Sequence, residues 1–220
     1  EVHCGTNISH WLSQSTSRGE DRRTWFTRAD VERIAGWHFD HIRLPIDEEQ
    51  MWSEGGTRQA EAFDLLTAAI EWCRDAGLRI IVDLHILRSH YFNDDSVPRL
   101  YTDPAERERF TDLWRDLSDV LGEYPNDLVA YELLNEAVAP DAATWNETWR
   151  APFTAIRERE PERTIVLGSN QFNQYQTYPE LDVPDDDHLI LTFHYYNPMF
   201  ITHYTARWWS GGSYTGPIRY

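Results

Sequence analysis

Six apolar segments of the sequence each end in side chains that donate or accept hydrogen bonds. The clearest is the run at 128–134, which stops at Asn135 and Glu136. Solvation explains one polar strand end, but six in a row, with Arg, His, Glu and Tyr among them, indicate a shared site, since the carboxyl ends of parallel strands meet on one face. In chain order these ends are Asn7, Arg43, Asp83 with His85, Asn135 with Glu136, Ser169 with Asn170, and His194 with Tyr196.

These side-chain types suit hydroxyl groups better than phosphate or metal. Arg43 is the one cation among the strand ends, and the sequence has no Lys for a phosphate or a Schiff base. His85, His90, His194 and His203 lie on separate segments without HExxH-type spacing, which favours structural or substrate-binding roles, although a metal site stays open. Asn, His and Tyr hydrogen-bond hydroxyls and Trp rings stack on sugars, so a carbohydrate ligand is indicated.

The elements that must position these groups alternate between short apolar strands and amphipathic helices. Strands are predicted at 1–8, 39–45, 78–85, 128–134, 163–168 and 188–196. Helices are predicted at 27–37, 58–77, 103–122 and 142–160. Pro45 is expected to close the second strand, Gly77 and Gly122 to end two helices, and Pro152 to kink or divide the last helix.

The alternation predicts a parallel sheet covered by helices, in one domain. Strands that are apolar throughout are typical of such sheets, which form either a doubly wound fold or a (β/α)8 barrel. No GxGxxG or GxxxxGK[ST] motif follows a strand, so the nucleotide-binding versions lose their usual support.

The charge of the chain limits its partners. A net charge of −17 argues against nucleic acid and anionic membranes, both of which need basic patches. All 20 basic residues are Arg. Two explanations of an acidic, lysine-free chain stay open, halophilic adaptation and high-GC codon usage.

Cysteine content and hydropathy exclude further classes. The sequence has two cysteines, Cys4 and Cys73, with no CxxC or Cys/His cluster, so both are expected to be buried thiols. No apolar run approaches the roughly 18 residues of a membrane span.

Four strand motifs resemble those of glycoside hydrolase family 5, the large family of β-glycanases with a (β/α)8 barrel. They are "HIRLP", "VDLH", "LLNEAV", and "LTFHYYNP" followed by "FITHY". Their order and spacing match along nearly the whole chain. The resemblance implies a (β/α)8 barrel of which six βα units are present, and an enzyme without a cofactor.

The resemblance also assigns roles to the strand ends. Glu136 matches the general acid/base, Asn135 the residue that hydrogen-bonds the sugar 2-hydroxyl, and Arg43 the arginine that supports the nucleophile. His85 matches a subsite histidine of the third strand. The sixth-strand pair follows, with His194 near the acid/base and Tyr196 near the nucleophile.

Six further residues are candidates for sugar platforms, subsite contacts or support of the site. Ordinary packing is the alternative for each of the aromatic residues. They are His90, His203, Trp11, Trp208, Trp209 and Asn170.

The sequence does not contain the second carboxylate that the family uses. The family's nucleophile is a Glu at the end of strand seven, and a Trp ends strand eight, but no Glu follows Glu180. A barrel of this type takes about 250 residues or more. Residues 1–220 are therefore expected to be a C-terminally incomplete catalytic domain, completed by a continuation of the chain or by a separate segment.

The predicted function is that of a retaining endo-β-glycanase on β-1,4-glucan, which uses two carboxyls about 5–5.5 Å apart. The substrate is a β-linked polysaccharide or oligosaccharide, and a secreted enzyme is expected because polymers do not enter cells. The alternatives are mannan, xyloglucan or β-1,3-glucan as substrate, a catalytically inactive glycan-binding barrel fragment, and a metal-dependent hydrolase of the same barrel shape.

Overall fold

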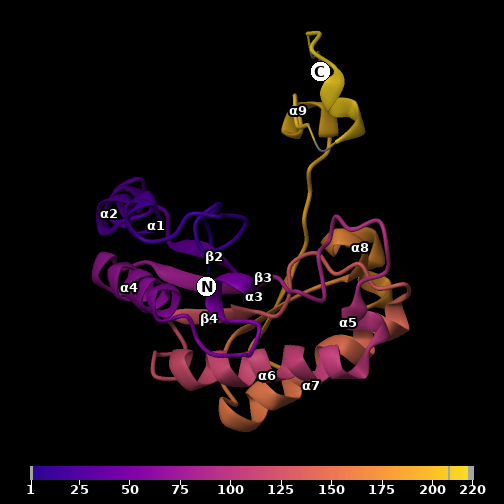
Figure 1. Cartoon of the computed structure of the whole chain (residues 1–220), viewed down its shortest axis with the longest axis horizontal. Coiled ribbons are helices and arrows are strands. Elements are labelled where there is room, and N and C mark those ends of the chain that lie inside the picture. The colour runs from indigo at the N-terminus through magenta and orange to yellow at the C-terminus, as the bar shows by residue number, and fades with distance from the viewer. Residues whose placement is uncertain (1, 208, 218–220) are drawn as a thin grey trace.

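The computed structural model describes residues 2–207 and 209–217, and its centre is one sheet of six parallel strands (Figure 1). The strands pair in chain order, so each strand from the second onward lies beside the strand that precedes it. Their bounds are β1 Gly5–Asn7, β2 His41–Asp47, β3 Arg79–Ile86, β4 Val129–Glu132, β5 Ile165–Gly168 and β6 Leu189–Thr192. The predicted order of six strands is confirmed, although β1 and β6 are shorter than predicted.

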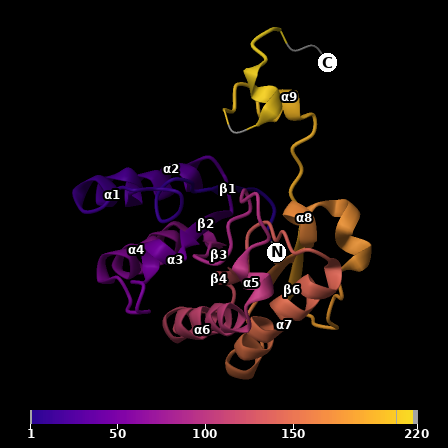
Figure 2. The ribbon, with the colours of Figure 1, turned by 45° about the vertical axis from the view of Figure 1, so that its right-hand side comes forward.

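The long helices α4, α6 and α7 run along the outside of the sheet (Figures 1 and 2). The helices are α1 Glu20–Trp25, α2 Arg28–Gly36, α3 Glu48–Met51, α4 Ala60–Ala76, α5 Arg99–Thr102, α6 Pro104–Leu121, α7 Ala142–Arg159, α8 Asn170–Asn173 and α9 Met199–Thr202. Two 3₁₀ turns, η1 Tyr175–Glu180 and η2 Ser210–Ser213, follow β5 and α9. The four predicted helices correspond to α2, α4, α6 and α7, whereas the short helices α1, α3, α5, α8 and α9 were not predicted.

The helix ends follow the signals in the sequence. Gly77 ends α4 in the left-handed conformation, at φ 73°. Asp103 caps α6 by accepting a hydrogen bond of 2.9 Å from the Ala105 amide. Pro152 does not divide α7, which passes through it as one helix.

Pro45 does not close β2, which continues to Asp47, so that prediction is wrong. Arg43 and Asp47 direct their backbone groups toward the β1 side, where they bond Ile8 and Leu12. Pro45 lies between them and has the same orientation, at a level where β1 has already ended at Asn7. A missing N–H therefore removes no bond of the sheet there.

Alternate residues of β2 face two different environments. Ile42, Leu44 and Ile46 are fully buried in the apolar core that the sheet shares with the helices. His41 and Arg43, on the other side of the strand, are half-buried. The period of two thus directs Arg43 to the inner face of the curved sheet.

Two helix tryptophans are tied to the carboxyl ends of the strands. The Trp114 indole of α6 donates to the Leu133 carbonyl at 3.0 Å, and the Trp145 indole of α7 donates to the Gly168 carbonyl at 3.0 Å. Both rings are fully buried. Their hydrogen bonds fix the points at which β4 and β5 leave the sheet.

The two cysteines differ. Cys73 is buried on α4, and burial raises the pKa of its thiol to about 12. Cys4 is exposed, so the prediction of a buried thiol is wrong there. The reason is that β1 begins only at Gly5 and lies at the edge of the sheet.

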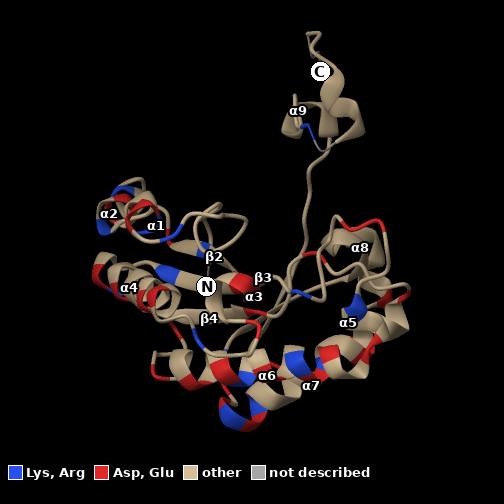
Figure 3. Ribbon diagram, in the orientation of Figure 1, with Lys and Arg blue, Asp and Glu red and all other residues tan. Residues whose placement is uncertain are grey.

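Residues beyond β6 leave the body of the molecule. An extended stretch carries the chain to α9 and η2, which stand apart from the sheet (Figures 1 and 2). Charged residues lie mainly on the outer helices, with acidic and basic positions mixed along α6 and α7 (Figure 3). Among the described residues, no helix is both long enough and apolar enough to span a membrane.

Candidate active site

Arg43 joins the inner faces of three neighbouring strands. Its Nε and Nη2 donate to the two carboxylate oxygens of Glu132 at 2.7 and 2.9 Å, and Nη2 also lies 2.8 Å from Asp83 Oδ2. Burial opposes the charge of this guanidinium, but the carboxylates of Asp83 and Glu132 outweigh it and raise the pKa of Arg43 above its ordinary value. The result is a fixed, permanently charged group below the strand ends.

The same guanidinium orients two amides. It donates to Asn135 Oδ1 at 3.0 Å and to Asn7 Oδ1 at 2.9 Å. Since Arg has no acceptor, the atom of Asn135 that faces it is the oxygen, and the NH₂ group of Asn135 is left to donate elsewhere. The arrangement makes Asn135 a preset donor for an acceptor oxygen on a ligand.

Glu136 contacts His194 directly. Glu136 Oε1 and His194 Nδ1 are 2.6 Å apart, and both side chains retain some exposure. The backbone of Glu136 is left-handed, at φ 46°, a conformation that costs a non-glycine residue about 1–3 kcal/mol. The site therefore presents one carboxyl group with a hydrogen-bonded imidazole, on a backbone that needs support from its surroundings.

Tyr196 lies edge-on to His194, with ring centroids 6.3 Å apart. Burial raises the pKa of its hydroxyl, and the charge of Glu136 adds to that effect. The phenol is therefore a neutral donor at ordinary pH. His194 and Tyr196 both follow the end of β6 at Thr192.

His85 is held by the carboxylate that also serves Arg43. Its Nδ1 lies 2.6 Å from Asp83 Oδ2, and the edge of its ring meets Phe92 at 5.4 Å. A carboxylate at Nδ1 favours the tautomer with the proton there, which makes Nε2 the acceptor. The sequence-predicted residues Arg43, His85 and Asn135 are thus brought into one connected network.

Two of the further candidates are turned away from this network. His90 is buried, stands edge-on to Tyr101 at 5.7 Å, and has its pKa lowered to about 3 by burial. Asn170 is also buried, and its amide bonds the backbone of Ala139 at 2.9 and 3.0 Å. Both are neutral packing or supporting groups in this structure.

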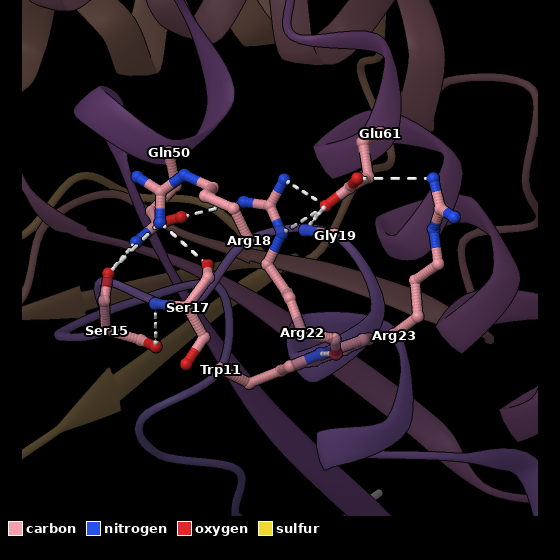
Figure 4. A network of polar contacts seen from close by, with 9 residues as sticks. All are labelled: Trp11, Ser15, Ser17, Arg18, Gly19, Arg22, Arg23, Gln50 and Glu61. Carbon is pink, nitrogen blue, oxygen red and sulfur yellow. Dashed lines mark hydrogen bonds and ion pairs between the residues drawn. The ribbon is translucent and has the colours of Figure 1, made fainter.

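Trp11 is fully buried and offers no face to a sugar. Its indole donates to the Arg22 carbonyl at 2.7 Å, within a polar network around Glu61 and Gln50 (Figure 4). Arg22 donates to both of these side chains, at 2.9 and 2.8 Å. Trp11 therefore fastens the segment after β1 to the helices.

The remaining candidates belong to the segment beyond the extended stretch. The ring of His203 meets Tyr196 at 5.0 Å and Trp209 at 5.9 Å, and Trp209 also packs on Phe200. Trp208 lies outside the described residues. This segment carries an aromatic cluster connected to the site through Tyr196.

Sequence reasoning missed the roles of Asp83 and Glu132. Glu132 lies inside the apolar run that predicts the fourth strand, at 128–134. A signal was present, because a carboxylate within a buried strand requires a charged or hydrogen-bonding partner, and alternation puts Glu132 on the inner face. Neither carboxylate is a free second acid, since both are bound to Arg43.

Within the described ranges, no group of three or more His, Cys, Asp or Glu residues is arranged to hold a metal ion. Glu136 is the carboxyl group that the site presents, with the His194 imidazole against it and the Asn135 amide next to it in the chain. That arrangement suits proton transfer to a sugar oxygen.

Comparisons with known proteins identify the family. The model for cellulases of glycosyl hydrolase family 5 matches residues 5–215. The chain belongs to this family. Its six parallel strands are the corresponding part of the family's (β/α)8 barrel.

Two relatives are similar to this chain over most of its length. Endoglucanase C of Acetivibrio thermocellus is 34% identical over 98% of this chain, which covers 64% of that protein. Cellodextrinase A of Ruminococcus flavefaciens is 33% identical over 93% of this chain, which covers 61% of that protein. The chain thus spans less than two thirds of these relatives.

Solved structures agree in fold. Cel5A of Thermotoga maritima, in complexes with cellobiose and with mannotriose, superposes with a TM-score of 0.80 in both cases. The identities are 26% and 25%, and the match covers 96% of this chain and 66% of Cel5A.

Proposed function

We propose that this chain forms most of the catalytic domain of a retaining endo-β-glycanase that hydrolyses β-1,4-glucan. The observation that carries the proposal is Glu136, held at the end of β4 against His194 at 2.6 Å and next to the preset amide of Asn135. Membership of family 5 and the names of the relatives, an endoglucanase and a cellodextrinase, support the same reading.

Glu136 acts as general acid and then as general base. It protonates the glycosidic oxygen as the bond breaks, and later removes a proton from the attacking water. His194 orients its carboxyl group through the contact at Oε1. Asn135 donates to the sugar 2-hydroxyl, a hydrogen bond that strengthens in the transition state.

The other strand ends bind and support. The fixed charge of Arg43 stabilises the nucleophile as a carboxylate, and the neutral phenol of Tyr196 donates to it. His85 contacts the sugar through Nε2. The aromatic cluster around Trp209 and His203 contributes further sugar contacts.

The nucleophile comes from outside the 220 residues. A segment that completes the barrel, as a continuation of the chain or as a separate piece, supplies it. The free side of β6 supports this proposal, because Leu191, Phe193 and Tyr195 are 42%, 56% and 60% exposed. Apolar surface next to an unpaired strand edge is covered in stable proteins.

The substrate choice follows the relatives. β-1,4-Glucan comes first because of the endoglucanase and of the cellobiose bound by Cel5A, and mannan comes second because Cel5A also binds mannotriose. A polymeric substrate implies that the enzyme acts outside the cell that makes it.

The test uses the protein as its host produces it, with its intact mass measured first. A mass above the 25.9 kDa of these 220 residues, with reducing ends released from a soluble β-1,4-glucan, is the expected result. Glu136→Gln should lower turnover by about 10²–10⁴-fold, and Glu147→Gln, at an exposed position of α7, should leave it unchanged.

Three other outcomes overturn parts of the proposal. Near-normal turnover in Glu136→Gln removes its role. Oligosaccharide binding without release of reducing ends supports the inactive glycan-binding barrel. Loss of activity with EDTA supports a metal-dependent hydrolase.

The acidic, lysine-free surface needs a separate experiment. A free energy of unfolding that falls away below molar NaCl supports halophilic adaptation, whereas a flat dependence on NaCl supports high-GC codon usage.

A further inference from the structure

The backbone that carries Glu136 is held by contacts from outside its own strand. The ladder between β4 and β5 ends with the hydrogen bond from the Leu133 amide to the Val166 carbonyl, at 3.2 Å. Glu136 follows in the left-handed region, which L side chains rarely adopt. The Asn135 amide still bonds the Leu84 carbonyl of β3 at 3.2 Å, so the conformation of Glu136 is set between that bond and the contacts that hold the residues directly after it.

The Asn170 amide provides the first of these contacts. The Ala139 N–H donates to Asn170 Oδ1 at 2.9 Å, and Asn170 Nδ2 donates to the Ala139 carbonyl at 3.0 Å. Asn170 is 5% exposed, and Gln171 Nε2 donates to the same carbonyl at 3.1 Å. One planar amide thus replaces the neighbouring strand that this stretch no longer has.

The residues after Asn170 connect this contact to His194. Gln171, Phe172 and Asn173 are all left-handed, at φ 54°, 63° and 54°. The Phe172 amide donates to the Ala137 carbonyl at 3.0 Å, and the Asn173 carbonyl accepts from the His194 amide at 2.9 Å. The turn is therefore bonded on one side to the residue after Glu136, and on the other to the backbone of its imidazole partner.

A second support approaches from α5. The Val138 amide donates to the hydroxyl of Tyr101 at 3.2 Å, and Tyr101 is buried. All of residues 137–139 are thus bonded to side chains or backbone of other segments. The stretch after Glu136 is a clamped loop.

We propose that Asn170 is a positioning residue of the active site. Its amide clamps Ala139, its turn bonds Ala137 and His194, and together these contacts set the separation and angle between the Glu136 carboxyl and the His194 imidazole. Asn170 itself does not touch the sugar. This inference rests on the proposed function of Glu136.

Loss of the Asn170 contacts should impair proton transfer by Glu136 more than the other steps of the reaction. A loosened clamp leaves binding and the attack of the nucleophile intact, but misdirects the proton that Glu136 delivers to the leaving oxygen. Sugar leaving groups need that proton, whereas a dinitrophenolate departs without it. The loss of kcat/KM should therefore be large for oligosaccharides and small for activated aryl glycosides.

Asn170→Asp is the test variant, because it keeps the size and replaces the NH₂ donor with a second oxygen facing the Ala139 carbonyl. In the protein as its host produces it, Asn170→Asp should lower kcat/KM by about 30-fold for cello-oligosaccharides. The loss for 2,4-dinitrophenyl β-cellobioside should be less than about 3-fold.

Asn146→Asp is the matched control. Asn146 Nδ2 donates to the Glu180 carbonyl at 2.9 Å and its Oδ1 accepts from the Asp182 amide at 3.0 Å, so it clamps a loop in the same way on the outer side of α7. Asn146→Asp should lower the melting temperature as Asn170→Asp does, but it should change kcat/KM by the same factor for both substrates.

Tyr101→Phe keeps the inference testable should Asn170→Asp fail to fold. It removes only the acceptor for the Val138 amide, and should produce the same difference between substrates at a smaller size, about 5-fold. An equal loss for both substrates in the Asn170 and Tyr101 variants overturns the inference. The proposed function stands in that case, provided that Glu136→Gln is inactive on oligosaccharides.

Discussion

The side chains of Arg43 and Arg163 bind toward opposite ends of the same sheet, Arg43 at Asn135 beyond β4 and Arg163 at carbonyls of the segment that leads into β4. Arg163 lies just before β5 and donates hydrogen bonds to the Glu160 carboxylate and to backbone carbonyls between the end of α6 and the start of β4. Its guanidinium also lies 4.9 Å from the centroid of the Tyr131 ring. Those carbonyls belong to Leu121, Tyr124, Pro125 and Val129. Arg43 instead donates to side chains, namely two carboxylates and two amides.

The two sets of partners indicate different roles for the two arginines. An arginine bonded to backbone fixes the path of the chain, whereas one bonded to side chains fixes the orientation of functional groups. Under the proposed function, the amino end serves stability and the carboxyl end serves chemistry, which is the division expected of a barrel of this kind. The same substitution at the two arginines should separate these roles.

The largest expected effect is that of Arg163→Lys. Lysine has three donors on a flexible stem in place of five in a fixed fork, so at least two buried carbonyls lose their partner. The free energy of unfolding should fall by about 3 kcal/mol, measured by urea denaturation. A loss below about 1 kcal/mol would contradict a structural role for this end.

Gly168→Ala comes next and concerns the carboxyl end. A Cβ at Gly168 would lie 2.3 Å from the Asn173 side chain, which is fully buried and would have to shift. Overpacking of this kind should cost about 2 kcal/mol. At the amino end, a Cβ at Gly5 would meet the His41 ring at 2.2 Å, but that half-buried ring can turn aside, so Gly5→Ala should cost less in the same denaturation experiment.

Arg43→Lys should reverse the pattern seen at Arg163. The charge beside Asp83 and Glu132 is kept, so the free energy of unfolding should change by about 1 kcal/mol or less. The two-point contact with Glu132 and the orientation of Asn135 are lost, and kcat should fall by about tenfold or more, equal to about 1.4 kcal/mol. A large loss of stability with unchanged kcat would contradict the assigned role of Arg43.

The smallest effect concerns two aspartates that flank β2. The hydrogen bond from His41 lowers the pKa of Asp40 to about 2, so the stability that Asp40 contributes is present above its ordinary value of 3.8 and is lost as the pH falls toward 2. Burial raises the pKa of Asp47 at the carboxyl end, so its ionisation costs stability, and that cost grows as the pH rises through the raised value.

Unfolding measured from low to neutral pH should distinguish the two. Asp40→Asn should remove stability at neutral pH but not below the lowered pKa, whereas Asp47→Asn should add stability at neutral pH and none in acid. The same sign for both variants would show that the two ends do not differ in this respect.

Much of this architecture could be predicted from the sequence because it depends on local pattern. Apolar runs, Gly77 and the Asp103 cap specify strands and helix ends through their own chemistry. Pro45 misled because its effect depends on where the neighbouring strand ends, which local sequence does not contain.

The sequence predicted those site residues that follow the ends of strands, but not the contacts between them. Glu136 and His194 follow apolar runs, and the geometry brings them together. The partnership of Arg43 with Glu132 joins residues 89 positions apart, and the burial of Trp11 depends on Arg22 and its network, so neither follows from spacing. Such contacts are properties of the packed molecule.

Pairing of the strands in chain order has a consequence for biosynthesis. Each of β2 to β6 lies beside the strand made just before it, so the sheet can grow one strand at a time as the chain leaves the ribosome. Pairing with the preceding strand keeps partners closer in sequence than a pairing that skips a strand, and so favours faster assembly than that alternative. At every stage the newest strand is the growing edge and the template for the next, and among the described residues β6 holds that position.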